Sequence, residues 1–262
     1  MKKILEYTLI FILTISTLAF ISACSEDDSP AEPEGAGGTN EFLNPSGQPT
    51  PSFASDPNYG GLMATINYEF QTLPGFPTAN LAMAYAQFGE GVDGGDVVVN
   101  QNTLGKNQIE GGTFYLVPSL SNPTQVLTNV NFNGSAHSWT VAGANSVPSI
   151  TGSVSSARTF SLTSPANDGV LTAANGVNIT WNGGTSSRVL IVLASTSGGN
   201  NYVAVEDLDD DGSHTIATNE LGGISGSAML QVVKYNYSSV NAGGKNYYII
   251  SEVVRTVSIT LN

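Results

Sequence analysis

The sequence has few cysteines, few histidines and few positive charges. Its 262 residues include one cysteine and two histidines. A single cysteine excludes an intrachain disulfide and a cysteine-based zinc site, and two histidines leave little material for acid–base or metal chemistry near neutral pH. Eight Lys and Arg stand against 21 Asp and Glu, which gives a net charge of −13. Because phosphate groups are bound through clustered cations, this balance argues against nucleic acid as a partner and against a polybasic membrane patch.

The first 23 residues have the pattern of a secretory signal peptide. Lys2 and Lys3 make the beginning of the chain positive, and an apolar run over residues 7–20 follows. This run is shorter than the ~20 residues that a membrane-spanning helix needs. Small residues then precede Cys24, the only cysteine of the chain. This order of features indicates export from the cytoplasm.

The segment Ile21-Ser22-Ala23-Cys24 resembles the lipobox of bacterial lipoproteins. The resemblance implies that the Cys24 thiol receives a diacylglyceryl group, and that cleavage then leaves Cys24 as an acylated N-terminus. Two or three acyl chains such as palmitate anchor a protein stably, whereas one chain is marginal. The alternatives are an ordinary secretory signal with an incidental cysteine and an uncleaved anchor.

Residues 24–58 are expected to form a flexible tether. They are rich in Ser, Pro, Gly and acidic residues, and such a composition cannot bury enough apolar area to offset the entropy of ordering. The segment Ser25-Glu26-Asp27-Asp28 resembles the signal that sends some Gram-negative lipoproteins to the outer leaflet of the outer membrane. The resemblance implies a lipid-anchored outer-membrane protein, whose folded part faces either the cell surface or the periplasm. A generic solvated linker is the alternative.

Short strands separated by turns follow from residue 59 to the end. Runs of β-branched, aromatic and alternating residues are bounded by Gly, Asn, Asp and Pro, and no window has a sustained 3.6-residue period. We therefore expect an all-β fold of two tandem antiparallel β-sandwich domains, residues 59–150 and 151–262, with a low-complexity seam at 145–157. The predicted strands are residues 62–70, 81–88, 97–99, 113–117, 138–141, 158–163, 176–181, 188–194, 202–206, 213–217, 227–235 and 247–261.

The second group of strands resembles the immunoglobulin-like and fibronectin type III superfamily. Ser164-Pro165 and the run over residues 177–181 are similar to its A–B region, which implies that Trp181 faces inward from strand B. The resemblance further implies strands C, E and G at residues 188–194, 213–217 and 247–261, with residues 223–235 as the loop that leads into strand F.

The chain as a whole is also similar to uncharacterised surface lipoproteins of Gram-negative bacteria. The likeness lies in residues 93–100 and 139–143 and in the order of signal, tether and β-sandwich modules. It implies an envelope location and no particular activity.

An acidic loop at residues 207–212 has the spacing of a calcium ligand set. Asp207, Asp209 and Asp211 alternate before Gly212, and alternate carboxylates in a tight turn converge on a hard cation. These three aspartates are therefore the candidate metal ligands. The alternative is a plain hairpin turn, because Asp-Gly is a favoured connection and the glutamate of an EF-hand loop is missing.

Aromatic side chains are the candidates for ligand binding, because a flat apolar ring stacks well on a sugar. Most of them are expected to lie in the core. In the pair Tyr247-Tyr248 the two rings lie on opposite faces of a strand, so one of them is a candidate for exposure. The whole candidate set is Trp139, Trp181, Tyr202, Tyr235, Tyr237, Tyr247 and Tyr248.

The sequence does not predict an enzyme. Cys24 is assigned to lipid, and His137 and His214 lie in different predicted domains. No Gly-x-Ser-x-Gly nucleophile elbow is present. We therefore expect a non-enzymatic surface binding or adhesion module for carbohydrate or protein. The alternative is a structural or assembly component of the outer envelope without a small ligand.

Overall fold

The computed structural model describes residues 49–53, 56–71, 78–109, 112–196 and 201–262. Strands account for almost all regular structure in these ranges, and the helical segments are two short 3-10 turns, η1 (Ala173–Asn175) and η2 (Thr218–Glu220). None of the helical segments in these ranges is long and apolar enough to span a membrane. The predicted all-β class is confirmed.

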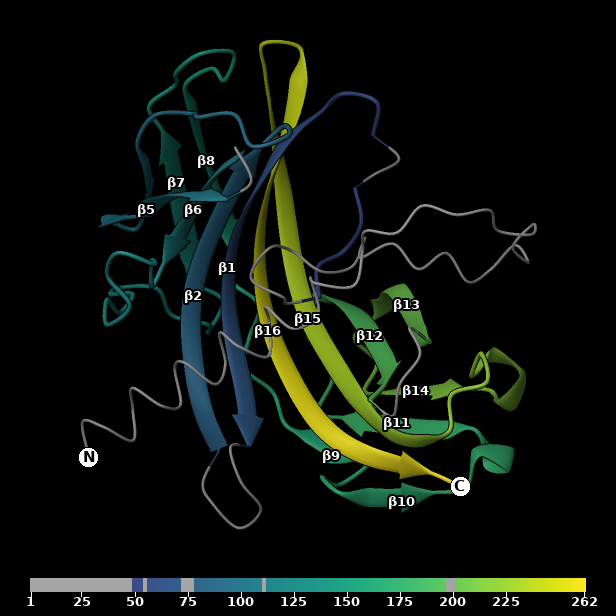
Figure 1. Cartoon of the computed structure of the whole chain (residues 1–262). Helices are drawn as coiled ribbons and strands as arrows, with labels where there is room; N and C mark the ends of the chain where they lie inside the picture. The colour runs from purple at the N-terminus through teal and green to yellow at the C-terminus, as the bar shows by residue number, and fades with distance from the viewer. Residues whose placement is uncertain (1–48, 54–55, 72–77, 110–111, 197–200) are drawn as a thin grey trace.

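Three sheets make up the fold, and the largest runs through the whole molecule (Figure 1). Its strand order is β13 (Tyr202–Asp209), β12 (Arg188–Ser195), β15 (Gly226–Ala242), β16 (Lys245–Leu261), β1 (Tyr59–Gln71), β2 (Thr78–Phe88), β6 (Gly112–Val117) and β5 (Gly105–Ile109), and β10 (Gly169–Leu171) pairs with β16 outside this order. A three-stranded sheet has the order β14 (Ser213–Ile216), β11 (Val177–Trp181), β9 (Leu162–Ser164). A four-stranded sheet has the order β4 (Asn102–Thr103), β3 (Val97–Val99), β7 (Ala136–Val141), β8 (Ile150–Ser155).

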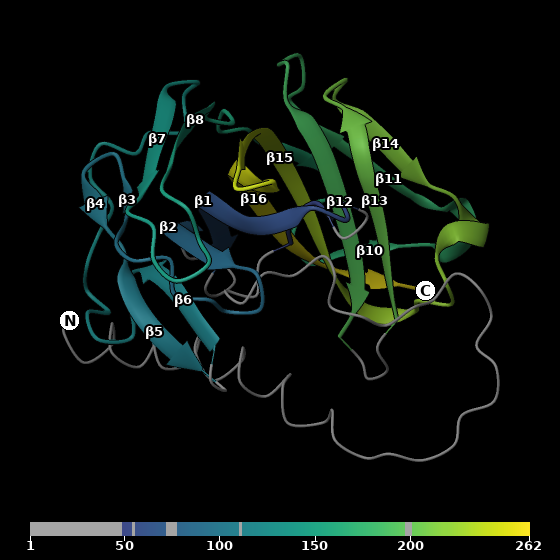
Figure 2. The ribbon, with the colours of Figure 1, turned by 90° about the horizontal axis from the view of Figure 1, so that it is seen from above.

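A long hairpin of β15 and β16 forms the spine of the large sheet. Each strand has 17 residues, which corresponds to about 55 Å of extended chain. Gly243 and Gly244 connect them with φ of 59° and 76°, the left-handed conformation that a two-residue hairpin turn requires. Figure 2 shows this hairpin between the blue and teal strands of the first half and the green strands of the second.

The boundary predicted at residue 150 does not separate two domains. β1, from the first half of the chain, pairs in parallel with β16, so that Ile66 lies beside Glu252. β10 also pairs in parallel with β16, and the large sheet is therefore mixed rather than antiparallel. The expectation of two tandem sandwiches is corrected to two small sheets that share one large sheet. A strand's local pattern shows that it is a strand, but long-range burial decides which strand it pairs with.

Alternation along the strands gives each face of the large sheet its own core. On β16, Ile249 packs with the four-stranded sheet and Val253 packs with the three-stranded sheet. Ile250 and Val254 point the other way and join a third cluster. Because successive side chains of a strand point to opposite faces, one face of the large sheet carries both small sheets. We call the opposite side, the side of Ile250 and Val254, the second face.

The strands of the second half pair as the immunoglobulin-like resemblance implied. β11 pairs with β14 and β9, β12 pairs with β15, and β15 pairs with β16. These are the B–E, A–B, C–F and F–G neighbours of an immunoglobulin-like sandwich. Trp181, on β11, is 4% exposed and packs in the core between the two sheets, as predicted. The strand pairing thus supports an immunoglobulin-like sandwich in this half.

Most predicted strands are present, with shifted ends. β9 begins only at Leu162, although a strand was predicted from residue 158. The predicted seam at 145–157 contains β8, a full strand of the four-stranded sheet. β8 was missed because it is rich in Ser, Thr and Gly and turns only Ile150 and Val154 fully into the core. β4, β5 and β10 were also missed, because β4 and β10 are very short and β5 is mostly polar.

Candidate binding site

The second face carries a row of four tyrosine rings, Tyr59, Tyr235, Tyr237 and Tyr248, which we call the aromatic platform. Ring centroids are 6.2 Å apart for Tyr59 and Tyr248, 6.5 Å for Tyr248 and Tyr237, and 6.4 Å for Tyr237 and Tyr235. Tyr237 is 51% exposed, whereas Tyr235 is buried. The row therefore begins in the core and reaches solvent at Tyr237.

Phe53 adds a fifth ring on top of the platform. Its ring lies over that of Tyr248 with centroids 3.9 Å apart and an interplanar angle of 15°, so the two rings are stacked. Its edge faces Tyr237 at 5.5 Å and 62°. Phe53 comes from the segment predicted as tether, so it approaches the sheet from outside the strand pairing.

The segment that carries Phe53, residues 49–53, is fixed to the sheet, and we call it the strap. The hydroxyl of Thr50 donates a 2.9 Å hydrogen bond to Glu252 on β16. The backbone N–H of Ser52 donates a 2.8 Å hydrogen bond to Glu206 on β13. The end of the predicted tether is therefore part of the folded unit.

Asp56 supplies a polar edge to the platform. Its carboxylate accepts hydrogen bonds from the Tyr248 hydroxyl at 2.8 Å, from the Asn246 amide at 2.9 Å and from the backbone N–H of Asn58 at 2.8 Å. The hydrogen bond from Asn246, followed by those from Asn58 and Tyr248, holds the pKa of Asp56 below its ordinary value. An ionised acceptor therefore lies beside the exposed part of the aromatic row. Burial raises the pKa of Tyr59 to about 12, so this ring stays neutral.

Glu252 is a carboxyl group buried under the strap. Its side chain has no exposed surface, and its Oε2 has no hydrogen-bond partner among the described residues, whereas Oε1 accepts from Thr50. Burial raises the pKa of Glu252 to about 8, more than the Thr50 hydrogen bond lowers it. The group is therefore mostly protonated and neutral at pH 7, which is the favoured state for an unpaired carboxyl in an apolar site.

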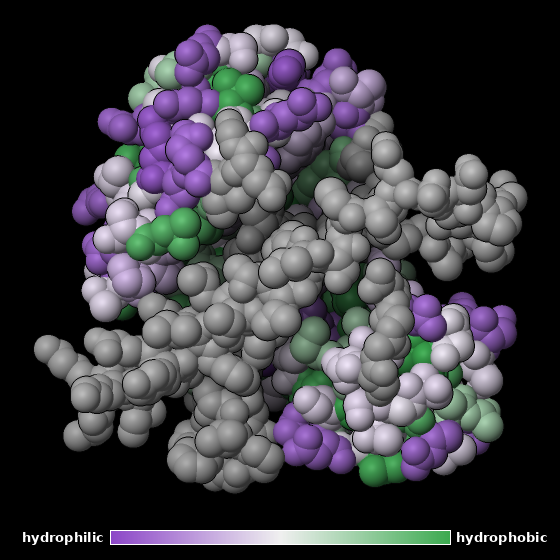
Figure 3. All heavy atoms as spheres, in the orientation of Figure 1, coloured by the Kyte–Doolittle hydropathy of each residue, from purple (hydrophilic) through white to green (hydrophobic). Residues whose placement is uncertain are grey.

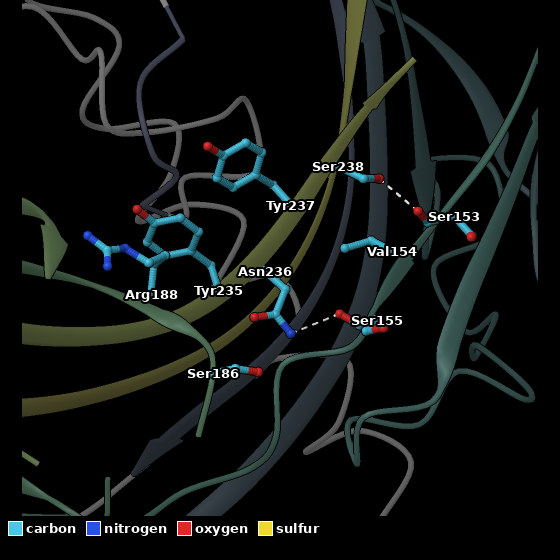
Figure 4. Close-up of a pocket in the computed structure, with 9 residues that line it drawn as sticks. All are labelled: Ser153, Val154, Ser155, Ser186, Arg188, Tyr235, Asn236, Tyr237 and Ser238. Carbon is cyan, nitrogen blue, oxygen red and sulfur yellow. Dashed lines mark hydrogen bonds between the residues drawn. The ribbon is translucent and has the colours of Figure 1, made fainter. Parts of the chain in front are cut away.

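An open pocket of about 440 Å³ lies next to Tyr237, between β15 and β8 (Figure 4). Tyr235 and Tyr237 project to one side of β15, and Asn236 and Ser238 project to the other, toward β8. The Asn236 amide donates to the carbonyl of Ser155 at 3.0 Å, and the Ser238 hydroxyl donates to that of Ser153 at 2.7 Å. The remaining lining residues are Val154, Ser186 and Arg188. The pocket therefore combines aromatic rings with small hydrogen-bonding side chains.

The predicted calcium ligands do not converge. Arg188 forms ion pairs with Asp207, at 2.7 Å, and with Asp209, and both carboxylates are largely exposed. Asp211 accepts a hydrogen bond from the backbone N–H of Ser213. Among the described residues, no group of three or more His, Cys, Asp or Glu side chains could hold a metal ion. Strand β13 continues as far as Asp209 and pairs with β12. Asp207 and Asp209 therefore lie on a strand beside Arg188 and do not surround a cation.

The fourth aspartate of the loop, Asp210, points into the sandwich interior. It forms a 2.8 Å ion pair with Lys234 and accepts a 2.7 Å hydrogen bond from the indole N–H of Trp181. Both the backbone N–H and the hydroxyl of Thr185 also donate to it. Burial raises the pKa of Asp210, but the hydrogen bonds from Lys234, Thr185 and Trp181 outweigh it and hold that pKa below its ordinary value. The acidic loop thus supplies a buried, fully hydrogen-bonded carboxylate to the sandwich interior.

The two histidines lie on different small sheets. His137, on β7, is fully buried, and its ring nitrogens lie 2.7 Å from the Thr65 hydroxyl and 3.1 Å from the carbonyl of Asn131. Burial lowers the pKa of His137, so the ring is neutral in the core. His214 lies on β14. The structure therefore does not bring them together, and a substrate has no access to His137.

Only part of the predicted aromatic set reaches the candidate site. Trp139, Trp181 and Tyr247 belong to the two cores under the small sheets, and Tyr202 lies on the edge strand β13. The local alternation correctly placed Tyr247 and Tyr248 on opposite faces. Phe53 and Tyr59 were not predicted, because their role depends on the strap and on the parallel pairing of β1 with β16.

Cys24, the predicted lipidation site, lies outside the described residues, as does the whole predicted signal peptide. The lipid anchor and the envelope location therefore stay predictions.

Hydrophilic residues dominate much of the described surface in the view of Figure 3, and hydrophobic residues form small separate patches there. Broad apolar patches mark protein or membrane interfaces.

Comparison with known proteins gives little further information. No protein-family model matches the sequence, and no curated protein matches it. Among solved structures the chain is similar to DIP-gamma IG1+IG2, with 10% sequence identity over 79% of this chain and 98% of that chain, and a TM-score of 0.21. A likeness of this size carries no argument about fold or function, so both rest on the strand pairing and the site geometry.

Proposed function

We propose that this protein is a lipid-anchored, non-enzymatic binding module of the bacterial envelope, and that its ligand is a carbohydrate. The anchor is Cys24, and the location is the outer membrane with the folded part exposed at the cell surface. The binding site is Tyr237, the exposed ring of the aromatic platform, together with the adjoining pocket.

The observation that carries the ligand class is the setting of Tyr237. Its ring is 51% exposed, the pocket beside it is lined by serine hydroxyls and the Asn236 amide, and the Asp56 acceptor lies by the neighbouring ring Tyr248. A sugar offers an apolar ring face for stacking and hydroxyl groups for hydrogen bonds. The site supplies both kinds of contact within one small surface.

Charge favours a neutral sugar over an anionic one. Arg188 is the cation of the pocket, and its guanidinium is already paired with Asp207 and Asp209. Asp56 adds a further negative charge nearby. An anionic ligand would therefore meet a net acidic surface, which is unfavourable.

The test is a glycan array probed with the chain from residue 24 onward carrying Cys24→Ser, followed by calorimetry on each hit. We expect Tyr237→Ala to abolish binding, because the stacking ring is removed, and Tyr237→Phe to keep it. Val170→Ala is the control, because Val170 is an exposed hydrophobic residue on β10, outside the platform and the pocket. Binding that survives Tyr237→Ala would contradict this site.

A structural or assembly role in the outer envelope is the alternative outcome of the same test. An array without hits, combined with stoichiometric binding of one purified envelope protein, would favour that role over carbohydrate recognition.

A further inference from the structure

The contact between Phe53 and Tyr248 differs from an ordinary core contact. Aromatic pairs usually have centroids 4.5–7 Å apart in offset or edge-to-face arrangements. Phe53 instead lies flat on Tyr248 at 3.9 Å and 15°, and Tyr237 faces its edge at 5.5 Å. A flat ring that covers one aromatic face and is flanked by another has the position of a bound ligand ring.

Phe53 reaches this position on a segment that is not a strand of the large sheet. Hydrogen bonds connect the strap to the sheet, among them those from Thr50 to Glu252 and from Ser52 to Glu206, each across more than 150 residues of sequence. The Phe53 carbonyl also accepts a hydrogen bond from the backbone N–H of Asp56 at 3.0 Å. Phe53 itself is only half-buried and lies outside the strands of the sheet, so its ring is expected to open locally at lower free energy than the strands beneath it.

We propose that the space above Tyr248 now filled by Phe53 is a subsite for a pyranose ring, and that Phe53 is its internal occupant. The inference rests on the proposed function, because it names a subsite of the same binding face. A ligand sugar would displace Phe53, stack on Tyr248 and extend along the platform toward Tyr237.

The groups at the edge of this subsite suit a sugar better than a second aromatic side chain. The Tyr248 hydroxyl, the Asn246 amide and the Asp56 carboxylate form a hydrogen-bonded group at one edge of the ring. Sugar hydroxyls can exchange hydrogen bonds with all three groups, whereas an apolar ring cannot. Tyr59 continues the platform beyond Tyr248 at 6.2 Å, so a ligand of more than one sugar has a second ring to stack on.

The competition between Phe53 and the ligand predicts the direction of the mutational effect. The apparent dissociation constant equals the intrinsic value divided by the fraction of molecules in which the subsite is open. If Phe53 fills the subsite in nine molecules of ten, its removal tightens binding about tenfold. Phe53→Ser removes the ring, and Phe53→Tyr is the matched control that keeps it.

The experiment uses the mature chain from residue 24 with Cys24→Ser, titrated with the neutral glycan that binds best on the array. We expect Phe53→Ser to bind several-fold to tenfold tighter than the parent, and Phe53→Tyr to bind like the parent. Thermal unfolding that stays cooperative shows that Phe53→Ser is folded. Equal or weaker binding by folded Phe53→Ser would overturn the proposal, as would tighter binding of an aromatic peptide than of any sugar.

Hydroxyl-radical footprinting of Tyr248 separates this inference from the proposed function. Oxidation of Tyr248 should rise in Phe53→Ser without any ligand, because its face becomes accessible, and glycan should restore protection. Unchanged oxidation would show that Phe53 does not cover Tyr248, and the subsite would fall even if sugars bind at Tyr237. Increased oxidation of Tyr248 in Phe53→Ser, without glycan binding by either chain, would confirm that Phe53 covers Tyr248. The same result would show that the ligand is not a carbohydrate.

Discussion

The ammonium of Lys234 lies 2.8 Å from the carboxylate of Asp210 inside the immunoglobulin-like sandwich, with 1% and 0% of the two side chains exposed. Lys234 also donates to the carbonyl of Asn182 at 2.6 Å and lies 4.9 Å above the ring of Phe160. The remaining capacity of Asp210 is taken by Trp181 and Thr185. A buried ion pair is tolerated when its other hydrogen-bonding groups are satisfied in this way.

Removing one partner of this pair should be strongly destabilising. We expect Asp210→Ala to lower the free energy of unfolding by about 3–5 kcal/mol, because the Lys234 side chain is left in the interior without its carboxylate partner. Urea unfolding at pH 7 measures the change. The double variant Asp210→Ala, Lys234→Met should recover part of the loss, since it removes both charges. A loss below about 1 kcal/mol in the single variant would mean that the pair is open to water.

Trp181 contributes both volume and a hydrogen bond to the same interior. We expect Trp181→Ala to cost about 3–5 kcal/mol, because it leaves a cavity between the two sheets. Trp181→Phe should cost less, since most of the ring volume remains and only the hydrogen bond to Asp210 is lost. Denaturant unfolding of both variants measures the difference. Equal costs for the two would show that the hydrogen bond, not the packing, dominates.

Glu252 should make the folded protein less stable as pH rises, whereas an acid paired with a cation has the opposite effect. Its pKa is about 8 in the folded chain against an ordinary value of 4.5, so the folded state holds one more proton between these values. The stabilising contribution is fully present below pH 4.5 and is lost as pH rises through 8, by up to about 1.4 kcal/mol per pH unit within the window.

Glu252→Gln isolates this effect, because glutamine is neutral at every pH and keeps an acceptor for Thr50. We expect the variant to be more stable than the parent at pH 9 and to show a flatter pH profile between 5 and 8. Unfolding midpoints measured across pH 5–9 for both chains test this. Parallel profiles would show that Glu252 is ionised or solvated in the folded protein.

Cys24 should determine where the full-length protein is found. We expect expression in a Gram-negative host to give a protein that partitions into the detergent phase and incorporates labelled palmitate. Cys24→Ser should lose both properties, because no thioether can form. Palmitate labelling that persists in Cys24→Ser would remove the basis for the lipid anchor.

Local sequence patterns predicted the strands well where a strand has two clear faces. Tyr247 and Tyr248 were assigned to opposite faces from alternation alone, and Trp181 was assigned to the core from the immunoglobulin-like resemblance of its strand. β8 was missed because its polar residues match those of a linker. Alternation follows from backbone geometry and is visible in any single strand, whereas a half-buried polar strand is recognised only when its neighbour is known.

The acidic loop shows why the candidate site was harder to predict than the strands. Spacing alone grouped Asp207, Asp209 and Asp211, but the strand directs two of them to Arg188, and Asp210 turns inward to Lys234. Arg188 lies on β12 and Lys234 on β15, so both cations come from strands outside the loop. No local pattern could therefore indicate which cation each carboxylate meets.

The sequence alone determined the all-β class and the scarcity of catalytic groups, because these depend on composition and alternation. The inward Trp181 and the predicted anchor at Cys24 came from short segments that resemble known families. The tertiary structure decided that both halves share one sheet, that Phe53 lies on Tyr248, and that Glu252 is buried beneath Thr50. These relationships join residues up to 202 positions apart. They are set by the burial of the whole chain, which no local pattern encodes.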